Sequence, residues 1–559
     1  MKLIFNRAYI FLLLISCLCF GQVGINTSSP KALFEVESSS EVTPSSTDGI
    51  MIPKMNQFPT TNPAINQHGM MVFITGNGAT PKGFYYWDGI LSNWVGINNG
   101  VDRINDLIDG KSDTSGESIY LGQNAGFTDS NPTISQNIGI GKQSLFHNAS
   151  GARNIAIGRY SLFNNETGNE NISIGFSALG ASTSGTYNTI IGNNAGSASI
   201  AASNNVALGH RALYANLANN QTAIGTNALS NNTTGSSNVA LGFDTLLANT
   251  TGQNNTALGT QSLRSNQTGN DNVGIGMSSL LNNNSNQNIA IGTNALRQNI
   301  DGFANVAVGH TALENSTATG NTAIGWQSAR NTTTGEFNTS VEGLSLLENI
   351  TGAANTAVGL RALRNNVIGF NNVALGFEAL RDNNSSDNIA IGVQSMVANV
   401  NGTSNVAVGH HTSFLNANGN NNTAIGRNVL YHNAVNDNTA VGAFAMQYNQ
   451  TGQRNVAMGV DALRDNVIGF NNEAIGYEAL IQNNISGNTA VGTGSMRSNV
   501  HGASNVAIGL ASSYSNVNGN NNTAVGREVL YYNTAHDNTA VGTYALQFNE
   551  NGNQNTSVG

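Results

Sequence analysis

Cysteine is almost absent from this chain. Cys17 and Cys19 are its two cysteines, and both lie near the N-terminus. They fall in a segment typical of a secretory signal peptide, in which a lysine and an arginine precede an apolar run too short to span a bilayer. We expect residues 1–21 to be removed by cleavage between Gly21 and Gln22. The exported chain would then have no disulfide, no thiolate metal site and no transmembrane span.

A second processing route fits the same segment. The sequence from Leu14 to Cys17 resembles a lipoprotein cleavage box, and cleavage there would leave a lipidated Cys17. Both routes place the mature chain outside the cytoplasm, at the cell surface or in the medium, in association with the outer membrane.

Proline is missing from most of the chain. Six of the seven prolines lie between Pro30 and Pro81, and the seventh is Pro132. Because proline cannot donate to a strand ladder, the part beyond it can form a continuous ladder. We expect residues 22–100 to form a separate small β module, with the aromatic residues of 83–94 filling its core rather than forming a glycan platform. Residues 101–117 are predicted to be a short helical neck or linker, from apolar residues at helical spacing.

Charge is also scarce. Charged residues make up 9% of the chain, the formal net charge is −9, and Lys142 is the last lysine. A sparsely charged, acidic surface argues against binding to nucleic acid or to an anionic membrane surface.

The chain is rich instead in one short motif, Asn-x-Ala-aliphatic-Gly. It recurs about every 16 or 17 residues from the glycine at 141 to the glycine at 559. A fixed short period is the signature of a solenoid. We predict an all-β chain in which residues 118–559 form a parallel β-roll of about 26 coils. At ~4.8 Å per coil, this array would be roughly 120 Å long.

One coil, 438–452, illustrates the expected side-chain directions. Strand alternation separates Thr439 and Val441 from Ala440 and Gly442. We expect the first pair to point inward, together with a row of Leu or Met four residues past the glycine on a second strand, such as Leu430. The small residues would then pack against another backbone, either the second sheet of the coil or, as we favour, a neighbouring subunit. The asparagine that opens each motif is expected to form an amide ladder.

A longer repeat is superimposed on the coils. From about residue 201 the sequence repeats every 100 residues, and 361–459 match 461–559 at more than half of their positions. We interpret this as duplication of a six-coil unit that lengthens the array.

Catalytic, cofactor and metal sites are not indicated. The calcium-binding nonapeptide of other β-rolls is absent, and acidic residues do not repeat in register. His210, His310 and His410 follow motif glycines but lie about six coils, ~29 Å, apart. His410 and His411 fit a solvated turn. We therefore expect no enzyme activity.

The motif resembles the head repeats of trimeric autotransporter adhesins, the YadA-like head, as in Asn422 to Gly426. This resemblance covers about residues 118–559 and implies a left-handed roll, a homotrimer and exposure on a bacterial surface. The chain lacks the long coiled-coil stalk and the C-terminal membrane barrel of that family, so the export route stays open. Val23 to Val36 and Gly83 to Gly89 resemble the openings of flavobacterial surface proteins and some tail-fibre modules.

Two functions follow as expectations. The first is a structural adhesin, a stiff rod that attaches to an extracellular matrix component, a glycan or another surface ligand. The alternative is a ligand-binding fibre, of the glycan, ice or phage-tail-fibre kind, whose repeat flank is the binding surface. Because the last coil opens at Asn555 without closing, we also expect a further segment or another chain to cover it.

Overall fold

The computed structural model describes residues 23–27, 34–36, 49–97, 107, 109–112, 117–129 and 135–559. The chain divides into two compact units, residues 1–103 and 104–559. The predicted signal peptide with its cleavage site at Gly21 and Gln22, and most of the predicted helical neck, lie outside the described residues.

The N-terminal unit contains two small sheets. β1 (Val23–Ile25) pairs in parallel with β2 (Phe34–Val36). The second sheet has the order β3 (Lys54–Met55), β4 (Met71–Ile74), β5 (Gly83–Asp88) and β6 (Asn93–Gly96), with the 3-10 turn η1 (Ile65–Gln67) between β3 and β4. Trp87 and Trp94 are cross-strand partners, buried against Val72 and Ile74. The two tryptophans therefore fill the core of the module, as predicted, and are not an exposed platform.

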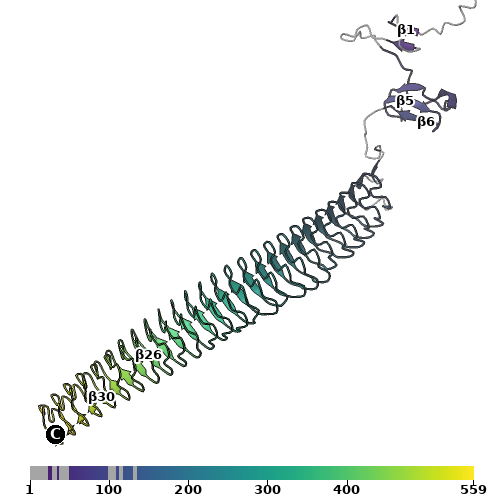
Figure 1. The fold of residues 1–559 in the computed structure, drawn as a ribbon. Helices are drawn as coiled ribbons and strands as arrows, with labels where there is room; N and C mark the ends of the chain where they lie inside the picture. Colours follow the sequence, from purple (N-terminus) through teal and green to yellow (C-terminus); the bar gives the residue numbers. More distant parts are fainter. Residues whose placement is uncertain are drawn as a thin grey trace, which may run out of the picture. The chain divides into compact units, whose positions relative to one another are not determined.

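The second unit is a parallel β-solenoid with one three-residue strand per coil (Figure 1). Its ladder begins with β7 (Gly110–Ser112), which pairs antiparallel with β8 (Ile119–Leu121), and every later pair is parallel. The strands after β8 are β9 (Ile138–Ile140), β10 (Ile155–Ile157), β11 (Ile172–Ile174), β12 (Thr189–Ile191), β13 (Val206–Leu208), β14 (Thr222–Ile224), β15 (Val239–Leu241), β16 (Thr256–Leu258), β17 (Val273–Ile275), β18 (Ile289–Ile291), β19 (Val306–Val308), β20 (Thr322–Ile324), β21 (Thr339–Val341), β22 (Thr356–Val358), β23 (Val373–Leu375), β24 (Ile389–Ile391), β25 (Val406–Val408), β26 (Thr423–Ile425), β27 (Thr439–Val441), β28 (Val456–Met458), β29 (Glu473–Ile475), β30 (Thr489–Val491), β31 (Val506–Ile508), β32 (Thr523–Val525), β33 (Thr539–Val541) and β34 (Thr556–Val558).

The strand faces are the reverse of those predicted. Ala440 is fully buried, whereas Thr439 and Val441 on either side of it are half-buried and point outward. The alanine column therefore lies inside the coil, against the row of Leu and Met side chains, and not at a subunit interface. Most coils carry alanine there because the coil is thin, and a larger side chain needs space on the facing wall.

The second wall of the coil is not a strand. Leu430 is fully buried, as predicted, but it has φ +49 and Asn428 has φ +53. These alternating left-handed residues replace the predicted second strand. They still bond to neighbouring coils, since the N–H of Leu430 donates to Ala445 (3.1 Å) and that of Asn428 to His410 (3.0 Å).

Motif glycines sit where adjacent coils touch most closely. Gly442 has φ +124, and a Cβ built there would lie 2.5 Å from the carbonyl carbon of Gly459. A residue other than glycine would be strained here, both by the left-handed backbone and by the contact of its Cβ with the next coil. Glu342 is the exception in this column, with φ +85.

Asparagine forms two buried ladders. In the predicted one, the side-chain oxygen of Asn388 accepts from the backbone N–H (3.0 Å) and the amide (3.1 Å) of Asn405. The second runs through the turn, where Asn416 donates to Asn399 at 3.1 Å and to the carbonyl of Gly419 at 3.1 Å. Together the ladders satisfy backbone groups at both corners of each coil.

Candidate functional site: the two faces of the solenoid

The outward residues of the strands form one aliphatic face along the solenoid. We define it as the first and third residues of β9 to β34. The third position is Ile, Leu, Val or Met in every one of these strands, and the first is Val, Ile or Thr in all but one. Exposed fractions are 48% for Leu208, 37% for Ile391 and 43% for Met458. An aliphatic surface this long exceeds what a soluble monomer ordinarily presents to water.

Glu473 interrupts this face. It takes the first position of β29, is exposed, and pairs in register with Val456 on one side and Thr489 on the other. It is the one charged residue in the strands from β9 to β34.

The segment after each motif glycine carries most of the ion pairs and the stacked aromatic rings of the solenoid. We call the second, fifth and sixth residues after the glycine the outer flank. Its central part holds ion-pair networks: Arg361 and Arg381 both contact Glu378, at 3.2 and 3.3 Å, and Arg381 also contacts Asp382 at 2.7 Å. Burial raises the pKa of Glu378, but hydrogen bonds from Gln394 and Arg361 together with the charges of Arg381 and Arg361 outweigh it, so the pKa is lowered overall. Glu378 therefore stays ionised at neutral pH.

Aromatic residues gather at other places on the outer flank. Phe127, Phe146 and Phe163 stack in successive coils at 5.0 and 5.3 Å. A second group lies further along: Phe414 stacks on Tyr431 at 5.1 Å, and His432 on Tyr448 at 5.7 Å.

A shallow groove adjoins this second group. It is lined by Phe444, Gln447, Tyr448, Asp461, Arg464 and Asp465. The Arg464 guanidinium contacts both carboxylates, Asp465 at 2.9 Å and Asp461 at 3.4 Å. These contacts fix the polar rim of the groove beside its aromatic wall.

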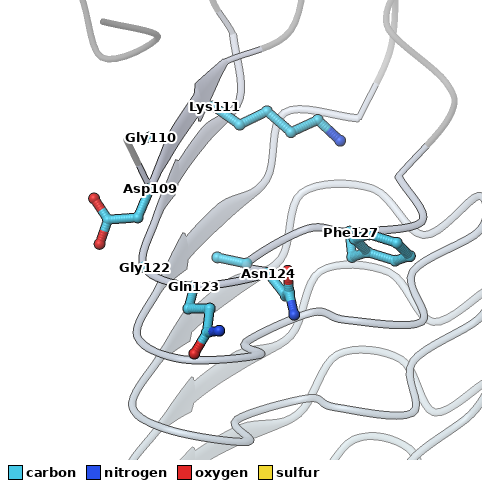
Figure 2. A pocket seen from close by; sticks show the side chains of 8 residues that line it. Asp109, Gly110, Lys111, Gly122, Gln123, Asn124 and Phe127 are labelled. Carbon is cyan, nitrogen blue, oxygen red and sulfur yellow. The ribbon is translucent and has the colours of Figure 1, made fainter. Parts of the chain in front are cut away.

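Another hollow lies at the start of the ladder, between β7 and the first coil (Figure 2). Figure 2 shows the Lys111 side chain extending across the end of this coil and the Asp109 carboxylate turned outward. The Lys111 ammonium donates to the carbonyls of Gly126 (2.8 Å) and Asp129 (3.1 Å). Beneath it, Tyr120 donates to the Asp129 carboxylate, and burial together with this contact raises the pKa of Tyr120. Lys111 thus satisfies carbonyls that the first coil would otherwise expose, which makes this hollow part of a cap.

The histidines singled out in the sequence do not converge. His410 and His411 contact each other, with ring centroids 3.8 Å apart, and His411 bonds to Gln394 at 2.6 Å. Across the described part of the chain, three or more metal-ligating side chains do not come together. The described residues also include no helix long and apolar enough to cross a membrane.

Comparison with known proteins relates one region of the chain to a described family. No curated protein matches the chain. A family model described as a phage tail like trimerisation region matches residues 23–116. The matched region covers the small N-terminal sheets and ends just before the first parallel coil. A trimerisation-like region followed by a long β-solenoid is the organisation of a structural fibre.

Proposed function

We propose that this protein is a homotrimeric structural fibre that is exported and acts at the cell surface as an adhesin. One observation supports the proposed assembly: the aliphatic face continues from β9 to β34, and the strands present almost no charge there. Covering the exposed part of each Ile, Leu or Val contributes about 1 kcal/mol. Summed over the solenoid, this is a large driving force for packing copies side by side along their length.

The similarity of residues 23–116 to a trimerisation region supports three as the number of copies. A trimeric region at one end would hold three solenoids in parallel and in register, so that equivalent aliphatic rows face one another. The resemblance of the repeats to adhesin heads supports the same stoichiometry and adds left-handed coils and an adhesive role.

The assembly is tested by placing charge on the aliphatic face. Ile391→Asp, Val408→Asp and Ile425→Asp, combined in one variant, should reduce the mass measured by light scattering from three chains toward one. The matched control adds the same charge at exposed turns, through Asn401→Asp, Gln450→Glu and Asn518→Asp, and should remain a trimer. A wild-type monomer, or equal masses for the two variants, would overturn the proposal.

Export and adhesion are tested on the native protein. The mature N-terminus should be Gln22, or Cys17 if the lipoprotein route operates, and surface labelling of intact cells should reach the solenoid. Cells without the protein should attach less to a solid surface or to extracellular material.

A phage-type tail fibre is the second candidate, and the match of residues 23–116 favours it. Such a fibre assembles in the cytoplasm, so residues 1–21 would not be cleaved from it. Intact-mass analysis separates the two functions, since a native chain that retains residues 1–21 would support the tail fibre and contradict the adhesin.

A further inference from the structure

Five outer-flank positions are aromatic in each of the last two 100-residue units. We call the first set the aromatic ladder: Phe414, Tyr431, His432, Phe444 and Tyr448. One hundred residues later the same positions hold Tyr514, Tyr531, Tyr532, Tyr544 and Phe548. One hundred residues earlier they hold Glu314, Asn331, Thr332, Leu344 and Glu348. Because the same coils form with either set, coil packing does not require these aromatic rings.

Four of the five rings of the ladder, Phe414, Tyr431, His432 and Tyr448, form a continuous strip across neighbouring coils. Phe414 and Tyr431 are parallel within 9°, and His432 and Tyr448 within 18°. In the second copy, Tyr514 stacks on Tyr531 at 5.0 Å and Tyr532 on Phe548 at 5.6 Å. Tyr448 is 42% exposed and Tyr532 44%, so part of this strip faces solvent.

Hydrogen-bonding groups border the strip. In the groove, Phe444 and Tyr448 lie beside Gln447 and beside the pair formed by Arg464 with Asp461 and Asp465. Arg427 lies over the Phe444 ring, 5.9 Å from its centroid. The salt bridges hold these polar groups in place, so little side-chain entropy is lost when a ligand binds.

We propose that the aromatic ladder and its groove bind a neutral polysaccharide. A pyranose ring has an apolar C–H face, which packs against the exposed edges of the stacked aromatic rings, and an edge of hydroxyl groups, which bond to carboxylate, guanidinium and amide groups. Rings repeated at the coil spacing of ~4.8 Å match a ligand that is itself a chain of similar short units. A neutral polysaccharide would be the ligand of the proposed adhesin, so this inference rests on the adhesin function.

Charge selects a neutral glycan over an acidic one. Arg464 is already paired with two carboxylates in the groove, and with Arg427 over Phe444 the four charges sum to zero, so the site has no net positive charge to attract uronic or sialic acids. The same lack of net positive charge, in a chain whose formal net charge is −9, disfavours single-stranded nucleic acid, the other polymer that stacks on aromatic rows.

The test is affinity electrophoresis of the full mature chain in gels that contain hydroxyethyl cellulose, xylan or glycol chitin, with polygalacturonate as the acidic comparison. At least one neutral polymer should retard the wild type. Alanine at Phe444, Tyr448, Tyr544 and Phe548, in one variant that changes two rings in each copy, should weaken retardation at least tenfold. The matched control, Leu344→Ala with Glu348→Ala, changes the equivalent coil one unit earlier and should bind as the wild type does.

Three outcomes would overturn the proposal: no retardation of the wild type by any neutral polymer, retardation by polygalacturonate alone, or equal weakening in the control. Light scattering on the same samples separates this result from the assembly proposal. A trimer that binds no neutral glycan would refute the site and leave the fibre intact. The melting temperature of the four-residue variant shows whether a loss of binding comes from unfolding, and Tyr448→Ala alone then provides the milder test.

Discussion

In two coils, a large core residue on one wall faces a glycine on the other wall, where most coils have alanine facing leucine. Tyr120 and Ile190 occupy strand positions that hold alanine in most coils, and Gly126 and Gly196 occupy the positions that hold leucine. A Cβ at Gly126 would lie 2.5 Å from the Tyr120 ring, and one at Gly196 would lie 3.5 Å from Ile190 and 3.1 Å from Leu179. A large residue on one wall is thus accommodated by a missing side chain on the other.

This exchange predicts a non-additive double mutant. Ile190→Ala leaves a cavity and should cost about 3 kcal/mol, while Gly196→Leu overfills the coil and should cost about 2 kcal/mol. Combined, they recreate the Ala and Leu pair of the other coils, at a backbone position whose φ of +55 resembles that of the usual leucine. The double variant should therefore melt above either single variant. Additive losses in thermal melting would show that the two walls do not compensate.

Glu342 stores backbone strain. It occupies the motif-glycine position with φ +85, where Gly325 and Gly359 on either side have φ +130 and +131. Replacing it with glycine should stabilise the solenoid by about 1 kcal/mol, because a left-handed backbone is less costly for glycine.

The measurement is the melting temperature of Glu342→Gly. Gly359→Ala is the control in the opposite direction, since its Cβ would lie 2.5 Å from the Gly376 carbonyl oxygen, and it should destabilise. A lower melting temperature for Glu342→Gly would mean that the glutamate side chain contributes more than its backbone conformation costs.

At the level of the coil, three-residue strands make few hydrogen bonds each, and the asparagine ladders supplement them. The side-chain oxygen of Asn433 accepts from Asn449 at 2.8 Å and from Asn438 at 3.1 Å, and its amide donates to Val435 at 2.8 Å. All three asparagines are fully buried, so water cannot replace a missing partner.

Asn433→Ala should therefore destabilise the solenoid by about 3 kcal/mol, because buried donors on Asn438 and Asn449 each lose an acceptor. Hydrogen exchange measured by mass spectrometry should show faster exchange in the adjacent coils than elsewhere. Asn401→Ala, at an exposed turn position, should change neither quantity by much. Equal effects would mean that the ladder adds little to the strand bonds.

The coil also shows which features a sequence can predict. The period predicted the parallel ladder, the buried Leu430 row and the first asparagine ladder, because these depend on repetition and residue type. It did not predict which strand face is inside: alternation of Thr439, Ala440 and Val441 is identical for either choice, and aliphatic side chains usually mark a core. The second wall was taken for a strand because leucine gives no sign of a positive φ.

The candidate surfaces were harder to predict for the same reason. From the sequence, the residues of the aliphatic face were expected in the core. The contact with a neighbouring subunit was therefore predicted for Ala440 and its equivalents. The aromatic ladder was missed because its positions hold different residues in different coils. Only comparison of units 100 residues apart, with Glu348, Tyr448 and Phe548 at one position, separates it from the surrounding variation.

For the whole molecule, coils should be removable in register. Deleting residues 361–460 joins Leu360 to Asp461 and keeps the spacing of the motif glycines. The solenoid should shorten by about 29 Å, visible by electron microscopy, with no change in oligomeric state. Deleting 361–452 instead breaks the period within a coil and should lower the melting temperature sharply. Similar stability for the two deletions would mean that the coils tolerate a shift in register.

Hydrogen bonds between coils run parallel to the long direction of the solenoid, since each strand pairs with the coil before it and the coil after it. A tensile load on the two ends would therefore open these contacts one coil at a time. Each detached coil releases about 17 residues, which extend to ~55 Å, in place of the ~4.8 Å it spanned. Under tension the fibre would lengthen by about 50 Å for each lost coil, so energy would be dissipated stepwise while the remaining coils stay folded. Toughness of this kind suits a tether that is pulled by flow.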